Sequence, residues 1–330
     1  MSNQLIKLAI IGLGKQGREH LKAMPLLNNV QISVGVESNI AAHAELQRDY
    51  PNLKIVSDIK ALDLETIHGI ILAVSHDSYS DIWPEVLNFG LPVLKEKPLG
   101  RNYQEAMDFV QKAKAANCPL QTAIQRRHHP SYMRLKEYIE SKNLPIEQIH
   151  AHFHLGFNPH KQDNSSWRAD IKKSGGGALL DSGYHFIDII HYLIGTFDLI
   201  TASLWKNAAL LPYDAVEDRA WLTGKTESCW VFIDTWVAGA PDVQTESGYK
   251  KSEGILIQSG EDRLFANRTV VLHNDQEIAC YPNDWQDAMR KQLENFAENI
   301  RRNTWQDEAI WDQLPAMRIV EEAYKQSILS

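Results

Sequence analysis

The chain has 330 residues, and its 34 lysines and arginines against 42 aspartates and glutamates give a formal charge of -8. The hydrophobic share of 44% and the charged share of 23% exclude a disordered polyelectrolyte and a membrane protein. The acidic balance argues against broad attraction to nucleic acid or anionic lipid, and the length predicts about two domains.

The three cysteines, Cys118, Cys229 and Cys280, are far apart and form no CxxC pair. This spacing predicts neither a disulfide framework nor a zinc–thiolate site, and it fits a reducing compartment. The N-terminal segment lacks the basic region of a signal peptide, and no apolar run approaches the ~20 residues of a membrane span. We therefore expect a cytoplasmic protein that contacts no membrane and no nucleic acid.

In the first 123 residues, apolar runs that predict strands alternate with segments of helical spacing. The strands are expected at 5–11, 30–36, 68–74, 92–95 and 119–124, and the helices at 15–24, 39–49, 78–89 and 103–116. Strand–helix alternation with short connections is typical of a doubly wound parallel sheet.

After residue 124 the predicted strands follow one another without intervening helices. They are expected at 149–155, 199–206, 220–223, 228–237, 254–259 and 269–273, with helices at 131–142, from 177 to 194, at 285–302 and at 307–328. Such a succession implies an open antiparallel or mixed sheet. The fold class is therefore predicted to be α/β, with one domain over residues 1–123 and a second over 124–330.

A glycine-rich loop follows the first predicted strand and opens the first predicted helix. It reads Gly12-Leu13-Gly14-Lys15-Gln16-Gly17, and this GxGxxG spacing also occurs by chance in ordinary turns. Between a strand and a helix, Gly12 would allow the tight turn, Gly14 the approach of a pyrophosphate, and Gly17 close helix–strand packing. The N–H groups at the start of the helix would face the anion, so the loop predicts a dinucleotide site.

An acidic residue closes the second predicted strand at the distance expected for such a site. Glu37 stands 20 residues beyond Gly17, where a carboxylate accepts hydrogen bonds from the adenosine ribose. Its neighbours Ser38, Asn39 and Ile40 carry no positive charge that would attract a 2′-phosphate. Because like charges repel at contact, the segment favours NAD over NADP. The alternative is that Glu37 is an incidental acid at a strand end, with no role in cofactor binding.

A lysine follows the fifth predicted strand in the segment Lys95-Glu96-Lys97-Pro98. Ligands of open parallel sheets bind at the carboxyl ends of the strands, and Pro98 biases Lys97 towards extended backbone. A lysine held there can donate to a substrate hydroxyl or exchange a proton. The alternative is a solvated turn lysine.

The segment after Gly175-Gly176-Gly177 is predicted to be a long, mostly apolar helix. On a continuous α-helix, Asp181, His185, Asp188 and Tyr192 fall within roughly 60° of one another. A narrow stripe of acids, histidine and tyrosine on a buried helix indicates a functional cleft, in which Asp181 orients the imidazole of His185. A structural Asp–His pair and a metal site remain alternatives, although the ligand spacing of a metal site is not recognisable.

Several weaker candidates are expected to contact substrate. His154 lies near the end of a predicted strand, Trp167-Arg168 can stack on and hydrogen-bond a polyhydroxylated ligand, and Arg126 follows the last parallel strand. The tryptophans of the later strands are expected to pack a sheet face or a subunit interface.

In combination and in this order, these segments resemble the glucose–fructose oxidoreductase, inositol dehydrogenase and MocA family. The matching residues are Gly12–Gly17, Glu96-Lys97-Pro98, Gln125-Arg126-Arg127, Pro130, Leu135-Lys136, Trp167-Arg168, Gly175-Gly176-Gly177, Asp181, Gly183, His185 and Asp188. The resemblance implies an N-terminal Rossmann domain, a C-terminal domain whose open sheet mediates homodimers or homotetramers, and NAD(P)-dependent chemistry on a sugar, cyclitol or nucleotide-sugar hydroxyl. It implies catalytic roles for Lys97, Asp181 and His185.

The resemblance also implies further cofactor contacts, and the chain departs from the family's pattern at two places. The contacts are expected from Ala73, Val74, Ser75, Tyr79, Glu96, Lys97 and Gln125. Family members often carry Thr-Pro-Asn-x-x-His where this chain ends its segment with Tyr79, and often Cys where it has Lys95. Two other functions stay open on this scaffold: NAD-dependent glycoside hydrolysis and a non-catalytic regulator that senses NAD or sugar.

Overall fold

The computed structural model describes residues 4–156, 167–207, 209–211, 215–237, 251–282, 285–305 and 312–329. It confirms the α/β class, with one six-stranded and one nine-stranded sheet. Each sheet is the centre of a compact unit. The six-stranded unit comprises Met1–Leu99, Met107–His128 and Asp284–Asp312, and the nine-stranded unit comprises Gly100–Ala106, His129–Asn283 and Gln313–Ser330. The domains expected at 1–123 and 124–330 stay a prediction, and each unit is built from several stretches of chain.

The six-stranded sheet is parallel throughout, in the order β3-β2-β1-β4-β5-β6. Its strands are β1 (Ile6–Ile11), β2 (Val30–Val36), β3 (Lys54–Val56), β4 (Gly69–Leu72), β5 (Val93–Glu96) and β6 (Leu120–Ala123). Its helices are α1 (Lys15–Lys22), α2 (His43–Asp49), α3 (Tyr79–Asn88), most of α4 (Tyr103–Ala115) and α8 (Trp285–Arg302). The strand order reverses between β1 and β4, which is where open parallel sheets bind ligands.

Helix α8 comes from the far end of the sequence but packs in the six-stranded unit. Its Met289, Leu293 and Phe296 are fully buried and share one apolar cluster with Leu8 and Ile32 of the sheet. The apolar spacing of α8 gives the helix one hydrophobic stripe, which the sheet covers.

The nine-stranded sheet is mixed, in the order β15-β14-β13-β12-β7-β11-β10-β8-β9. Its strands are β7 (Gln148–Leu155), β8 (Asp198–Lys206), β9 (Ala209–Leu210), β10 (Arg219–Lys225), β11 (Trp230–Val237), β12 (Lys251–Ser259), β13 (Asp262–Ala266), β14 (Val270–His273) and β15 (Gln276–Cys280). Strands β7 and β11 run parallel, and the other pairs are antiparallel.

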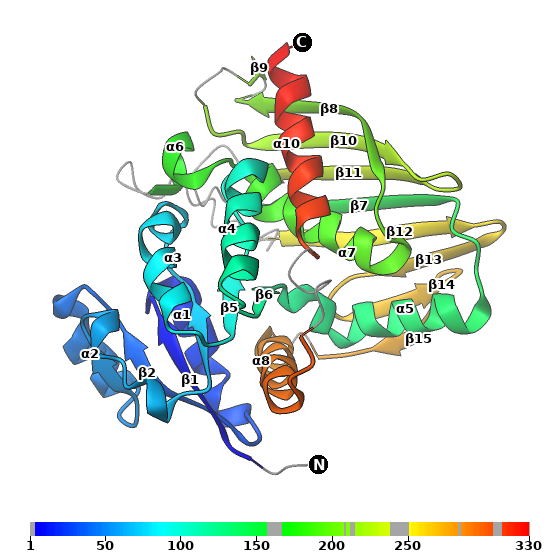
Figure 1. The fold of residues 1–330 in the computed structure, drawn as a ribbon. Helices are drawn as coiled ribbons and strands as arrows, with labels where there is room; N and C mark the ends of the chain where they lie inside the picture. The colour runs from blue at the N-terminus through cyan, green and yellow to red at the C-terminus, as the bar shows by residue number, and fades with distance from the viewer. Residues whose placement is uncertain are drawn as a thin grey trace. The chain divides into compact units, whose positions relative to one another are not determined.

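Helices cover one face of this large sheet, and the opposite face carries aromatic side chains. Figure 1 shows α5 (Pro130–Lys142), α7 (Tyr184–Ile194) and α10 (Leu314–Leu329) lying along the covered face. Burial alternates along β11, where Val231, Ile233 and Thr235 are buried and their neighbours are not. On the open face, Trp221 is 58% and Trp230 is 48% exposed. Large aromatic side chains that are exposed on a sheet face often mark an interaction surface.

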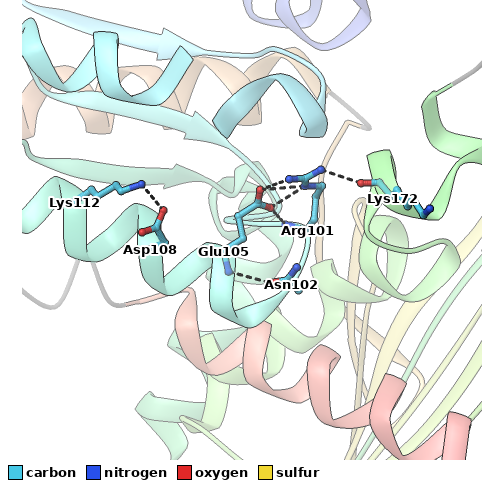
Figure 2. A network of polar contacts seen from close by, with 6 residues as sticks. All are labelled: Arg101, Asn102, Glu105, Asp108, Lys112 and Lys172. Atoms are coloured by element: carbon cyan, nitrogen blue, oxygen red, sulfur yellow. Dashed lines mark hydrogen bonds and ion pairs between the residues drawn. The ribbon is translucent and has the colours of Figure 1, made fainter. Parts of the chain in front are cut away.

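The start of helix α4 is fixed by a short polar network (Figure 2). The Asn102 side chain accepts from the Glu105 N–H at 2.8 Å, as an N-terminal cap does. The Arg101 guanidinium pairs with Glu105 at 2.7 Å and donates to the Lys172 carbonyl at 2.9 Å, while Lys112 pairs with Asp108 one turn further on. Arg101 thereby connects the start of α4 to α6 (Ile171–Ser174), just before the Gly-rich turn.

No helix among the described residues is both long enough and apolar enough to cross a bilayer.

Candidate active site

The glycine-rich loop joins β1 to α1 in the tight turn that its spacing predicts. Gly12 has φ +93°, and its N–H donates to the Val36 carbonyl at 2.9 Å. A Cβ on Gly17 would lie 2.0 Å from the Gly12 carbonyl oxygen, so helix and loop pass in close contact there. A Cβ on Gly14 would meet no atom within 4 Å. The loop therefore keeps open space at Gly14, beside the N-terminus of α1, where a pyrophosphate fits.

Glu37 lies beside this loop at the end of β2. Its carboxylate accepts from the Leu13 N–H at 3.1 Å and from the Asn39 N–H at 2.9 Å. Two backbone donors hold the side chain at the rim of the loop, and its contact with a ribose hydroxyl stays a prediction. Ser38, the next residue, is exposed.

A second carboxylate, Glu96, ends β5 and is 3% exposed. Its Oε1 lies 2.7 Å from His20 Nε2 and 3.4 Å from Gln16 Nε2, both on helix α1. Its Oε2 is buried and has no hydrogen-bond partner among the described residues. Buried carboxylate oxygens normally have a donor, so Oε2 is suited to accept from a hydroxyl of a bound cofactor. Gln125, which follows β6, is also buried, and its Oε1 likewise has no partner in this part of the chain.

The segment after β4 lies against the glycine-rich loop. The Ala73 N–H donates to the Ile11 carbonyl at 2.8 Å, and the Ala73 carbonyl oxygen would be 2.6 Å from a Cβ on Gly12. Val74 follows, and its Cγ1 would be 3.0 Å from the same Cβ, while the Ser75 hydroxyl is 2.8 Å from that of Ser78. This segment therefore lies beside the loop, and the cofactor contacts expected of Ala73, Val74 and Ser75 stay predictions.

Tyr79 points into the core. It is 2% exposed, its hydroxyl donates to the Leu72 carbonyl at 3.4 Å, and the Lys95 ammonium lies over its ring. Burial, together with the negative charge of Glu96, raises the pKa of Tyr79 well above its usual range. The structure therefore gives Tyr79 a packing role under the sheet edge, and its cofactor contact stays a prediction.

Lys97 is half-buried in the turn that follows β5, and the Lys97–Pro98 peptide bond is cis. Because β5 pairs with β4, and β4 with β1, the carboxyl ends of these strands lie in a row. Gly12, Ala73 and Lys97 thus follow neighbouring strands at one edge of one sheet. Within the six-stranded unit, Lys97 therefore lies at the same sheet edge as the glycine-rich loop.

The Gly-rich segment of the nine-stranded unit leads into a helix that is not α-helical throughout. A π-helical turn spans Leu179–Gly183, and α7 begins only at Tyr184. The prediction of a continuous α-helix is therefore wrong, and the wheel angles calculated from it do not hold across this turn. Asp181 lies in the π-helical turn and His185 in the first turn of α7. Such turns are frequent at functional sites.

His185 is 6% exposed, and its ring stacks on Phe153 of β7 at 6.4 Å between centroids. Asp188, predicted to share the polar stripe, is fully buried and accepts from Gln313 Nε2 at 2.7 Å. Gln313 in turn accepts from the Tyr184 hydroxyl at 2.8 Å. Asp188 thus joins α7 to the start of α10. Asp181 and His185 stay the predicted candidates for chemistry.

Sequence reasoning missed Glu217, which lies under this helix. The fully buried carboxylate accepts from the Gly177 N–H at 2.9 Å, the Leu179 N–H at 2.8 Å and the Tyr324 hydroxyl at 2.7 Å. A Cβ on Gly177 would lie 2.1 Å from the Glu217 carbonyl oxygen, which explains a glycine there. Burial raises the pKa of Glu217, and its hydrogen bonds oppose that shift.

The remaining candidates lie at separate places. His154 pairs with Asp234 at 2.7 Å on the open face of the large sheet, whereas Phe153 faces His185 on the other side. The structure therefore does not bring His154 to His185. Arg168 stacks over Trp167 at 4.4 Å in the nine-stranded unit, and Arg126 is 1% exposed in the six-stranded unit.

Among the described residues, no group of three or more His, Cys, Asp or Glu side chains is arranged to hold a metal ion.

Two family models match most of the chain. One, an oxidoreductase family with an NAD-binding Rossmann fold, matches residues 6–124, and the other, a GFO/IDH/MocA C-terminal domain, matches residues 132–245. The chain belongs to the Gfo/Idh/MocA family of oxidoreductases. Its NAD-binding Rossmann fold and the predicted family resemblance are confirmed.

Curated relatives in the Gfo/Idh/MocA family include sugar and cyclitol dehydrogenases. The chain is 26% identical over 211 residues to levoglucosan dehydrogenase of Pseudarthrobacter phenanthrenivorans, over 61% of this chain and 54% of that protein. It is 28% identical to an uncharacterized oxidoreductase of Schizosaccharomyces pombe, over 64% of this chain and 58% of that one. Inositol 2-dehydrogenase of Corynebacterium glutamicum is 21% identical, over 78% and 73%. The first two alignments thus span little more than half of each relative.

Solved structures share the fold over nearly the whole chain. Levoglucosan dehydrogenase in complex with NADH and levoglucosan has a TM-score of 0.81, with 20% identity over 97% of this chain and 98% of that chain. A variant of a 3-ketoreductase from Actinomadura kijaniata, in complex with TDP-benzene and NADP, has a TM-score of 0.76 and 15% identity over 97% of each chain. At these identities the likeness shows the fold alone.

Proposed function

We propose that this member of the Gfo/Idh/MocA family is an NAD-dependent dehydrogenase that acts on a hydroxyl of a sugar, cyclitol or nucleotide sugar. The observation that carries the proposal is the shared sheet edge. The glycine-rich loop at Gly12 follows β1 and the turn at Lys97 follows β5, and β4 lies between these two parallel strands. A nicotinamide held at this edge would have Lys97 within the same binding region.

The proposed chemistry divides the work among three side chains. NAD, when bound, supplies the acceptor for the hydride that leaves the substrate carbon. His185 takes the proton of the same carbinol, because an imidazole has a pKa near the working pH, and Asp181 orients it. Lys97 hydrogen-bonds the hydroxyl oxygen and helps to relay the proton. Arg126, Trp167 and Arg168 are proposed as substrate contacts.

The proposed preference for NAD over NADP rests on Glu37. Two backbone N–H groups fix its carboxylate at the rim of the loop, so it cannot easily turn away from a 2′-phosphate. A phosphate there would meet a like charge, whereas the hydroxyls of NAD would meet an acceptor.

Two further proposals concern the environment of the chain. The open face of the nine-stranded sheet, with Trp221 and Trp230 exposed, supports a homodimer or homotetramer that covers it. Cys118, Cys229 and Cys280 are free thiols, which supports a reducing cytoplasm.

A screen of levoglucosan, myo-inositol and nucleotide sugars, with NAD and NADP in parallel, tests the function by NADH absorbance. We expect reduction of NAD by at least one polyol and a lower kcat/KM with NADP.

Lys97→Met should lower kcat about 100-fold or more while the NADH dissociation constant changes about threefold or less. Wild-type turnover by Lys97→Met would refute its role. Release of sugar from a glycoside without net NADH would instead show the hydrolase.

A further inference from the structure

Lys95 is an unusual side chain for the core of the six-stranded unit. It lies in strand β5, two residues before Lys97, and is 0% exposed. Lysine is almost never fully buried without partners, because removing an ammonium from water is costly. The contacts around Lys95 must therefore compensate for the loss of water.

Two of these contacts are backbone carbonyls on either side of Lys97. Lys95 Nζ donates to the Pro98 carbonyl at 2.9 Å and to the Glu96 carbonyl at 3.3 Å. Glu96 directly precedes Lys97, and Pro98 directly follows it. The ammonium thus ties the backbone together across the residue that the proposed function places at the substrate.

Aromatic rings also lie against this ammonium. Nζ lies 3.5 Å from the ring centroid of Tyr79 on α3 and 5.3 Å from that of Phe109 on α4. The two rings pack edge to face at 6.4 Å. An ammonium has three N–H donors, and two carbonyls with one ring face can accept all three. Lys95 is therefore arranged to hold its surroundings, with its donors directed at the protein itself.

We propose that Lys95 is a positioning residue that clamps the Glu96–Pro98 turn and thereby aims Lys97. A methionine or leucine would fill the same space without burying a charge. The ammonium adds two hydrogen bonds, one to each of the carbonyls that flank Lys97, and it lies over the Tyr79 ring. The proposal rests on the proposed function for the role of Lys97, but the clamp itself is a property of the turn.

Hydrogen exchange followed by mass spectrometry tests the clamp without any substrate. Lys95→Met keeps the side-chain volume and removes the charge and its donors. We expect exchange in a peptide covering residues 96–101 to become about tenfold faster or more, while a peptide covering β1 stays within about twofold. Tyr79→Phe, which keeps the ring and loses only the hydroxyl, is the matched control and should leave the turn as in the wild type.

Enzyme kinetics with the polyol identified in the screen provide a second test. Misplacing a catalytic group by about 1 Å can cost about 100-fold, so Lys95→Met should lower kcat about 10- to 100-fold with KM and NADH affinity nearly unchanged. If that variant does not fold, Tyr79→Leu, which removes the ring under the ammonium, should still speed exchange in the turn.

Unchanged exchange in the turn, or equal acceleration throughout the six-stranded unit, would overturn the clamp. The proposed function fails separately, when the wild type oxidises no polyol or when Lys97→Met retains full turnover. In that case the exchange result still decides whether Lys95 fixes the turn.

Discussion

At the scale of single residues, the carboxylate of Glu217 connects the Gly-rich segment before α7 to helix α10. It is fully buried and receives two N–H groups from the helix start and the hydroxyl of Tyr324. The burial of Tyr324 and the charge of Glu217 raise the pKa of that tyrosine well above its usual range, so it stays a donor. Glu217 thereby fixes the backbone from which Asp181 projects.

Glu217 is expected to make the stability of the protein depend on pH. Burial raises its folded pKa above the ordinary value of 4.5, so between these two values the native state binds more protons than the unfolded chain. Its contribution is therefore full below about pH 4.5 and is lost as pH rises through the folded pKa. Glu217→Gln cannot lose a proton, so its thermal midpoint should fall less between about pH 5 and about pH 7 than that of the wild type.

The exposed Glu227 of the same unit provides the matched control, since Glu227→Gln should keep the wild-type pH dependence. Glu217→Ala should be the least stable of the three, because each buried N–H left without an acceptor costs about 1–3 kcal/mol. Parallel pH profiles for Glu217→Gln and the wild type would contradict the assignment.

At the scale of elements, the loop between β1 and α1 separates two uses of glycine. A Cβ on Gly17 would collide with the Gly12 carbonyl at 2.0 Å, whereas a Cβ on Gly14 would meet no protein atom within 4 Å. The fold needs a glycine at position 17, whereas Gly14 leaves room for a ligand.

Two alanine variants should therefore behave differently in thermal unfolding with and without NADH. Gly17→Ala should lower the midpoint of the free protein, because the backbone contact must open. Gly14→Ala should keep that midpoint but lose most of the shift that NADH gives, since a methyl group would occupy the approach of the pyrophosphate. Equal loss of stability in both variants would refute the distinction.

The elements also show what the sequence can and cannot predict. Strands β1, β2 and β4 are largely buried and read as apolar runs, so their positions were predictable. Strand β3 has three partly or fully exposed residues, too few for a pattern. The π-helical turn at Leu179–Gly183 was missed because the helical wheel assumes 3.6 residues per turn throughout.

The site shows the same limits. The positions of the GxGxxG loop, Glu37 and Lys97 at strand ends of the six-stranded sheet were predictable, because each follows a short apolar run. The contacts of Lys95 and Glu217 were not predictable, because their partners are far apart in the sequence or are backbone atoms. Two local features of the sequence pointed to a special role of Lys95. It is a lysine inside an apolar strand, and the chain departs from the family's pattern both there and at Tyr79, whose ring the Lys95 ammonium contacts.

At the scale of the whole molecule, pattern alone could not assign α8 to its unit. Its hydrophobic stripe indicates that something covers it, and only the structure shows that β1 and β2 do. The open face of the nine-stranded sheet poses the same problem between molecules. Trp205, Trp221 and Trp236 line a groove there with Arg219 and Asp234. Aromatic residues with an arginine are the composition that protein interfaces favour.

If a second copy of the chain covers this face, a charge at its most exposed tryptophan should break the assembly. Trp221 is 58% exposed, so Trp221→Glu should leave the protomer folded while it buries an unpaired carboxylate in any interface. Light scattering after size exclusion should then give a mass near 37.5 kDa, where the wild type gives a multiple of it. Ile40→Glu, at a residue 70% exposed in the six-stranded unit, should leave the mass of the wild type unchanged. A wild type that is already monomeric, or a Trp221→Glu oligomer of unchanged mass, would show that this face has no copy of the chain against it.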